Sequence, residues 1–188
     1  MSIYDFNALK GVAVKNDLLH RQLYATDASV YRIYPDGVCF PKDKSEIIAL
    51  VNFARENQMP LIPRAGGTSL AGQVVGEGLV VDVSKHFNQI IDFDPKAKKI
   101  RVQPGVVRDD LNEFLAPHQL FFGPNTSTSN RCTIGGMAGN NSSGTTSIKY
   151  GVTRDKVIAI ECVLFDGSVV VFEDLNKEQY QEKEKIQN

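Results

Sequence analysis

The sequence predicts a mixed α+β chain built on an α/β core, with a glycine-rich loop between two strands. The apolar run 61–63 ends at Arg64 and leads into Gly66 and Gly67, and a second apolar run follows at 79–83. A strong helical pattern precedes the first run, and two turn sequences between apolar runs follow the second. This order places the loop at the carboxyl end of a strand, where open α/β sheets commonly bind ligands.

The helix before the loop is the clearest single element. Asp43 can cap its N-terminus, and Glu46, three residues later, can complete a capping box. Pro60 is expected to end it, because proline interrupts helical hydrogen bonding. One apolar stripe at helical spacing runs along this segment: Ile47, Leu50, Val51 and Ala54.

Other elements follow from turn residues and apolar runs. Residues 18–23 suit one or two helical turns, Pro35-Asp36-Gly37 favours a turn, and 38–41 is typical of a short strand. Beyond the loop we expect a hairpin of 89–93 and 99–103, and then a helix over 107–115 closed by Pro117. An apolar strand or turn is expected at 120–124. A second hairpin, of 157–165 and 168–172, is expected around Asp166-Gly167, followed by a polar helix or frayed end at 173–188.

The length of 188 residues fits one domain or two small subdomains that share a cleft. A boundary near residue 84 is expected. It divides the chain into an N-terminal extension (1–36), a first subdomain (37–84), a second subdomain (85–173), and a polar tail or start of a linker (174–188).

Composition excludes several classes of protein. The net charge of −1, without a basic stripe, gives no electrostatic case for nucleic acid or an anionic membrane. Cys39, Cys132 and Cys162 are far apart and odd in number, so they form neither a metal motif nor a disulfide framework. No apolar stretch approaches the ~20 residues of a membrane span, and the N-terminus lacks a signal-peptide core. A cytoplasmic location is expected.

Residues 125–144 are almost entirely small and polar, and Arg131 is their one charged residue. Disordered segments usually carry more charge and more repetition. A wrap around a polar ligand is therefore favoured over a disordered loop.

The glycine-rich loop is either an anion-binding nest or a tight connection without a ligand. It is not a Walker A motif, because no Gly-Lys-Ser/Thr follows, and it lacks the GxGxxG spacing of a dinucleotide fingerprint. A hairpin, and not a crossover helix, is expected next, which disfavours nucleoside triphosphates and NAD. The two polar segments together indicate a long ligand between them.

Residues 63–73, PRAGGTSLAGQ, resemble the FAD pyrophosphate loop of the vanillyl-alcohol-oxidase-type flavoproteins. Residues 133–144, TIGGMAGNNSSG, resemble the second flavin segment of that family, and Tyr150-Gly151 and 157–167 resemble the strand and hairpin that come after it. Order and spacing agree from about Val38 to Phe172. The resemblance implies a two-subdomain PCMH-type FAD-binding fold with FAD between the subdomains.

Within that family the chain looks most like the branch of the glycolate oxidase D-subunit, D-lactate dehydrogenase and D-2-hydroxyglutarate dehydrogenase. Residues 25–31 and 127–131 look like those of large bacterial members that carry iron–sulfur motifs further on. The resemblance implies oxidation of a D-2-hydroxy acid by hydride transfer to flavin N5, with an unknown electron acceptor. An alditol or sugar oxidase, an enolpyruvyl-sugar reductase and a non-catalytic nucleotide-binding subunit are the alternatives.

The resemblance also implies roles for single residues. Backbone N–H groups of residues 65–69 would hold the pyrophosphate, residues 72 and 73 would lie beside the ribityl chain or flavin, and Ile160 would meet the adenine. The implied cofactor-binding residues are Arg64, Ala65, Gly66, Gly67, Thr68, Ser69, Gly72, Gln73, Pro124, Thr128, Thr133, Gly135, Gly136, Gly139, Asn140, Ser143 and Ile160.

The chain departs from the family pattern in two respects. Thr68 stands where some relatives carry a flavin-linked histidine, and Cys132 is offset from a second linkage position, so non-covalent FAD is expected. The family's substrate domain and catalytic cluster follow the flavin domain, so both are expected to lie outside this chain, as would any iron–sulfur cluster. For that reason no catalytic residue is assigned here, and no metal ligand is assigned either. The three histidines (His20, His86, His118) are isolated and are expected at surface or core positions.

Overall fold

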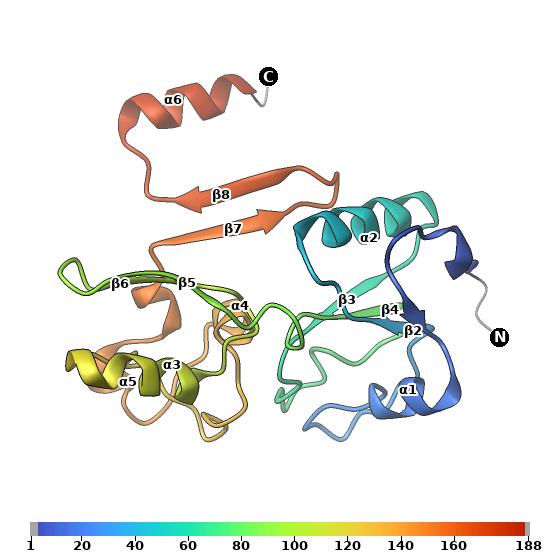
Figure 1. Cartoon of the computed structure of the whole chain (residues 1–188), viewed down its shortest axis with the longest axis horizontal. Helices are drawn as coiled ribbons and strands as arrows, with labels where there is room; N and C mark the ends of the chain where they lie inside the picture. Colours follow the sequence, from blue (N-terminus) through green and yellow to red (C-terminus); the bar gives the residue numbers. More distant parts are fainter. Residues whose placement is uncertain (1–3, 187–188) are drawn as a thin grey trace.

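The computed structural model describes residues 4–186. Its largest sheet has four strands in the order β1-β2-β4-β3. They are β1 (Val14–Lys15), β2 (Gly37–Cys39), β4 (Leu79–Asp82) and β3 (Leu61–Arg64). Strand β1 is antiparallel to β2, whereas β2, β4 and β3 are parallel, and Figure 1 shows α2 (Lys44–Glu56) on one side of the sheet and α1 (Leu18–Leu23) on the other. The predicted α/β core is confirmed.

Helix α2 begins as the sequence predicts. A carboxylate oxygen of Asp43 accepts a hydrogen bond from the backbone N–H of Glu46 at 3.0 Å. The Glu46 carboxylate accepts in return from the N–H of Lys42, one residue earlier than in a standard capping box. The helix ends at Glu56, ahead of Pro60, because Gln58 adopts a left-handed conformation with φ 51°.

The glycine-rich loop connects two parallel strands. Leu61 lies opposite Leu79, and Arg64 lies opposite Asp82. Residues 65–78 therefore cross over without a helix, as expected, but they do not close a hairpin. The hairpin comes only after β4, as β5 (Ile90–Asp94) and β6 (Lys99–Val102).

Two hydrophobic clusters divide the core. The first lies between α2 and the four-stranded sheet and includes Leu50, Leu79 and, from the N-terminal segment, Leu9 and Val12. The short 3₁₀-helix Phe6–Ala8 also belongs to this N-terminal segment, and Phe6 packs on the cluster. The second cluster packs α3 (Arg108–Leu115) on the β5–β6 hairpin, with these residues at its centre: Val106, Leu111 and Leu115.

The predicted helix at 107–115 is confirmed as α3, but Pro117 does not close it sharply. A 3₁₀ turn, Ala116–His118, follows directly, and Gln119 then reverses the chain with φ 58°. Residues 120–124 form no strand in the described structure.

The polar segment after residue 124 is folded. It contains α4 (Ile134–Asn140), which the sequence did not predict, and it is followed by α5 (Ser147–Tyr150) and a 3₁₀ turn, Thr153–Lys156. The Thr133 hydroxyl caps α4 by accepting from the Gly136 N–H at 3.4 Å, and Met137 is buried beneath it. Nonlocal burial and capping therefore stabilise a helix whose glycines have poor helix propensity.

The second predicted hairpin is confirmed as β7 (Ala159–Val163) and β8 (Val169–Glu173), and helix α6 (Lys177–Ile186) follows it. A carboxylate oxygen of Asp166 accepts from the Ser168 N–H and hydroxyl in the turn. The turn is held to α2, because Arg55 donates to the Asp166 carbonyl at 2.8 Å.

An ion triad joins α2 to the two hairpins and gives a pH-dependent contribution to stability. The Lys44 ammonium lies 2.8 Å from one carboxylate oxygen of Glu161, and the Arg101 guanidinium lies 3.6 Å from the other. The hydrogen bond from Lys44, followed by the two positive charges, lowers the pKa of Glu161 below its ordinary value of 4.5. The stabilisation is therefore present above about pH 4.5 and is lost as the pH falls through the lowered pKa.

We expect Glu161→Gln to lower the free energy of unfolding at pH 6 and to have progressively less effect below pH 4.5. Urea unfolding of both proteins between pH 3 and pH 6 measures this difference. Added salt should shrink it at pH 6, because the triad is partly exposed. An equal difference at every pH would contradict the ionic origin.

Candidate cofactor site

The glycine-rich loop presents a row of unused backbone donors. Within the described residues, no acceptor is hydrogen-bonded to the N–H groups of residues 65–69. Gly67 has φ +60°, which is the left-handed conformation that lets successive N–H groups point into one concavity. Such a nest fits a doubly charged diphosphate, which needs several donors more than it needs one specific side chain.

The loop is shaped by its own side chains. The Ser69 hydroxyl accepts from the Ala71 N–H at 3.1 Å and donates to the Gln73 side-chain oxygen at 2.9 Å. Gly72 lies against the ring of Tyr31, where a Cβ would overlap the aromatic carbons. Ser69 and Gly72 therefore fix the conformation of the loop, and the N–H groups of residues 65–69 remain free for a ligand.

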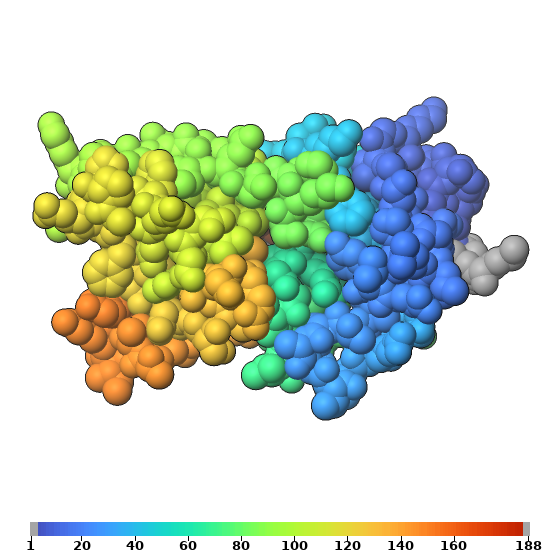
Figure 2. All heavy atoms as spheres, turned by 60° about the horizontal axis from the view of Figure 1, so that its bottom comes forward, coloured from blue at the N-terminus to red at the C-terminus, as the bar shows by residue number. Residues whose placement is uncertain are grey.

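The structure brings together the two glycine-rich segments, which are the loop at 65–78 and the polar segment at 125–144. The Gln73 amide donates to the side-chain oxygen of Asn140 on α4 at 2.9 Å. A Cβ at Gly66 would overlap the carbonyl oxygen of Arg131, and one at Gly136 would lie 3.6 Å from the Cβ of Ala65. Figure 2 shows the loop (teal) beside the second segment (light orange) in the middle of one face. The expectation that one ligand contacts both segments agrees with this arrangement.

The N-terminus of α4 differs from the loop because its donors are already used. The Ile134 N–H donates to the Val106 carbonyl, and the Gly135 N–H donates to the Pro104 carbonyl. The Thr133 hydroxyl is occupied in capping, and Gly135 packs so closely on Pro104 that a Cβ would overlap it. Thr133 and Gly135 are therefore occupied in holding α4 in place, and the free donors come from the loop.

The remaining predicted residues divide into buried and open positions. Pro124 is buried, and its carbonyl accepts from Arg108 at 3.2 Å. The Thr128 carbonyl accepts from two N–H groups of the turn that follows it. Gly139 has open space where a Cβ would stand, and Ser143 is exposed. Ile160 lies on β7 opposite Phe172, in a hairpin separate from both glycine-rich segments.

Arg64 points back into the protein. Its guanidinium carbon lies 5.0 Å from the centre of the Tyr24 ring, and one guanidinium nitrogen donates to the Thr26 carbonyl at 2.8 Å. The Tyr24 hydroxyl in turn donates to the buried carboxylate of Asp82 at 2.5 Å. Burial, then the bond to Asp82, raises the pKa of Tyr24.

Sequence reasoning missed Tyr24, Tyr31 and Asp82. A signal was present for Asp82, because it is the one charged residue in the apolar run 79–83, and a charge there needs a partner when buried. No comparable signal marked the two tyrosines, whose role depends on packing across 30 residues or more of chain.

Two histidines and one cysteine of the described residues are occupied by local contacts or buried. His20 is paired with Asp17 at 2.7 Å, and His118 packs against Phe93. Burial, as the largest effect, raises the pKa of Cys39 to about 12, which makes its thiol unreactive. Among residues 4–186, no cluster of His, Cys, Asp and Glu could hold a metal, and no helix is long and apolar enough to cross a membrane.

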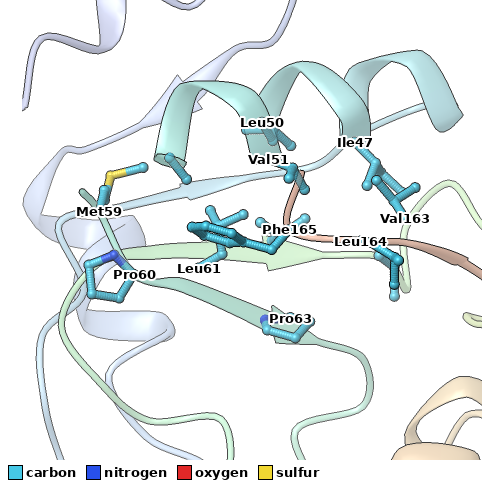
Figure 3. A pocket seen from close by; sticks show the side chains of 13 residues that line it. Ile47, Leu50, Val51, Met59, Pro60, Leu61, Pro63, Val163, Leu164 and Phe165 are labelled. Carbon is cyan, nitrogen blue, oxygen red and sulfur yellow. The ribbon is translucent and has the colours of Figure 1, made fainter. Parts of the chain in front are cut away.

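An apolar cavity lies away from this site. It has a volume of about 390 Å³, and residues of α2, β3, β4 and the β7–β8 turn line it. Figure 3 shows the Phe165 ring beneath α2, among the aliphatic side chains that surround the cavity. None of the predicted cofactor-binding residues is among those that line it. This cavity is apolar, so it does not suit a diphosphate.

Fold and candidate site together define a class of protein, an α+β domain in which a glycine-rich loop with free backbone N–H groups follows a strand of a mostly parallel sheet. The family model described as an FAD binding domain matches residues 35–173. The chain belongs to this FAD-binding family, so the cofactor that the sequence indicated is confirmed.

Two curated relatives illustrate the branch. The chain is 42% identical over 149 residues to the D-2-hydroxyglutarate dehydrogenase of Haemophilus influenzae, and the match covers 78% of this chain and 14% of that protein. It is 38% identical over 152 residues to the glycolate oxidase subunit GlcD of Bacillus subtilis, covering 80% of this chain and 32% of that protein. The chain therefore spans less than a third of each relative.

Solved structures agree on the fold. An alkyldihydroxyacetonephosphate synthase superposes with a TM-score of 0.76 at 21% identity, covering 89% of this chain and 33% of that chain. A xylooligosaccharide oxidase from Myceliophthora thermophila superposes with a TM-score of 0.74 at 24% identity, covering 89% and 35%. Likeness at this identity establishes the fold alone, and it confirms the predicted PCMH-type FAD-binding fold.

Proposed function

We propose that this chain is the FAD-binding domain of a longer flavin-dependent oxidoreductase that oxidises the CH–OH group of a D-2-hydroxy acid. The observation that carries the proposal is the row of free N–H groups at residues 65–69, in a chain whose relatives are D-2-hydroxyglutarate and glycolate enzymes. D-2-hydroxyglutarate, D-lactate and glycolate are the candidate substrates. The sugar oxidase of the same fold is too distant, at 24% identity, to support a sugar substrate.

The residues of this chain would bind and orient the cofactor. The 65–69 amides would hold the pyrophosphate, and the Gln73–Asn140 pair would close the site between the two segments. Bound FAD supplies a hydride acceptor at flavin N5, and the substrate domain of the longer protein would supply the catalytic side chains. Apart from Arg64, the residues predicted from the sequence are proposed to line this site, with Thr133, Gly135 and Pro124 shaping its wall.

We also propose that the site lies between two subdomains, 37–84 and 85–173, with residues 1–36 as an extension and 174–188 as a tail or linker. The two hydrophobic clusters support the division, and the packing of Leu9 and Val12 in the first cluster ties the extension to the first subdomain. A cytoplasmic location is proposed, supported by the three free cysteines. The electron acceptor is left open.

FAD binding is tested with the chain itself, by titration followed through flavin fluorescence and by the flavin absorbance of the purified protein. Substrate choice is tested with the longer protein, by measuring reduction of its flavin after each candidate substrate is added. The candidates are D-2-hydroxyglutarate, D-lactate and glycolate, with xylitol as a comparison. Reduction by xylitol alone would overturn the hydroxy-acid proposal, and failure of both proteins to take up FAD would overturn the cofactor assignment.

The flavin is expected to be non-covalent, because Thr68 offers no imidazole and the Cys132 thiol is buried at 3.2 Å from the Thr126 hydroxyl. Acid precipitation of the FAD-loaded chain should therefore release all of its flavin into the supernatant. Yellow colour retained in the washed pellet would contradict this. Cys132→Ala, loaded and precipitated in parallel, would then locate the bond.

A further inference from the structure

An N-terminal segment, residues 24–31, packs against the glycine-rich loop and the ends of the strands beside it. It makes contact at three points: Tyr24 with Asp82 and Arg64, the Thr26 carbonyl with Arg64, and the Tyr31 ring with Gly72. All three points lie at the end of β3 or β4 or inside the loop itself. The segment therefore supports the loop at the strand ends beside it and at Gly72.

We propose that Arg64 is a positioning residue, which holds the loop in its anion-binding shape by clamping it to the 24–31 segment. The proposal rests on the proposed function, because it concerns how strongly the loop binds the FAD diphosphate. It differs from the role that the resemblance implied, in which Arg64 would contact the cofactor directly.

The guanidinium is fixed from two directions. The Tyr24 ring supports one face, and the Thr26 carbonyl accepts from one edge at 2.8 Å. Tyr24 is itself held by its hydroxyl bond to Asp82, which also accepts from the N–H and hydroxyl of Ser84 at 2.7 Å. A planar group bound in this way keeps one orientation, which a flexible ammonium would not do.

The fixed guanidinium lies directly against Gly67. A Cβ at this position would overlap the atoms Nη2, Cζ and Nε of Arg64. Gly67 is the residue with φ +60° on which convergence of the N–H groups depends. The Arg64 guanidinium therefore fills the space beside Gly67 and supports the residue whose left-handed conformation shapes the nest.

The test compares FAD dissociation constants of the 188-residue chain and its variants, measured by flavin fluorescence at a temperature where each apo-protein is folded. Arg64→Met should weaken FAD binding by about tenfold, since a cation–π contact and a charged hydrogen bond are lost. Arg64→Lys keeps the charge and one donor, so it should recover part of the loss, to within about threefold of the parent chain.

Arg32→Met is the matched control. Arg32 also lies over a tyrosine ring, that of Tyr34 at 5.3 Å, and donates to its hydroxyl, but it is exposed and does not touch the loop. Its FAD affinity should equal that of the parent chain. Thermal unfolding of each apo-protein separates a general loss of stability from a specific loss of FAD affinity.

The outcomes separate the inference from the function on which it rests. A parent chain that binds FAD, together with a folded Arg64→Met variant of unchanged affinity, would overturn the positioning role and leave the proposed function standing. Equal losses in Arg64→Met and Arg32→Met would also overturn it. A parent chain that binds no FAD would overturn the positioning role, and failure of the longer protein to bind FAD as well would overturn the proposed function. If Arg64→Met does not fold, the Arg64→Lys result decides: unchanged affinity refutes the role, and a loss of about two- to threefold supports it.

Discussion

Gly66→Ala is expected to push the two glycine-rich segments apart and to weaken FAD binding by about 5- to 150-fold. The new Cβ would overlap the carbonyl oxygen of Arg131, which is a backbone atom that cannot rotate away. Forcing a methyl group into such a contact typically costs ~1–3 kcal/mol, which corresponds to that range of affinity. This strain is expected to weaken FAD binding, because Gly66 itself carries one of the free N–H groups.

Gly76→Ala serves as the control, because it adds the same methyl group in the same loop. A Cβ there would lie 3.2 Å from the flexible end of the Ile62 side chain, which can move aside. Fluorescence titration of both variants with FAD gives the comparison. Near-equal affinities for the two variants would show that contact between the segments at Gly66 does not control FAD binding.

Local chemistry explains which parts of the fold were predictable. The cap at Asp43 and the Asp166-Gly167 turn depend on residues within a few positions of one another, and both elements form where the sequence places them. The nest at residues 65–69 was also predictable in kind, because consecutive small residues leave backbone donors uncovered. The parallel pairing of β3 with β4 was beyond a local reading, because it depends on contacts across the sheet.

The helix α4, which the sequence did not predict, and the orientation of Arg64, which differs from the prediction, have a common physical cause. Helix α4 contains three glycines and forms because Thr133 caps it, Met137 is buried, and carbonyls of residues 104 and 106 accept from its first N–H groups. Arg64 was expected to bind the cofactor, because the family resemblance implied that role. Its inward orientation depends on Tyr24, 40 positions earlier in the chain. Both features are set by tertiary contacts, which local propensity does not include.

Asp82 gives the second large effect, on stability. Its side chain is buried at the end of β4, with 5% of the residue exposed, and it accepts three hydrogen bonds: one from Tyr24 and two from Ser84. A buried carboxylate is tolerated only when its oxygens are paired in this way. Removing it leaves the partner donors without their acceptor, and each stranded buried group costs free energy.

Asp82→Ala should therefore lower the free energy of unfolding by about 2–4 kcal/mol, measured by urea denaturation at pH 7. Asp82→Asn keeps an acceptor oxygen and should lose less, whereas Asp92→Ala, at an exposed aspartate on β5, should change stability by less than about 0.5 kcal/mol. Similar free energies of unfolding for Asp82→Ala and Asp92→Ala would refute the role of the buried carboxylate.

Asp82 should also affect FAD binding, because it holds Tyr24 and the Tyr24 ring supports Arg64. Asp82→Ala should therefore weaken FAD binding, and Asp92→Ala should not. One buried charge would thereby stabilise the first subdomain and, through the same contacts, the loop proposed to hold the cofactor.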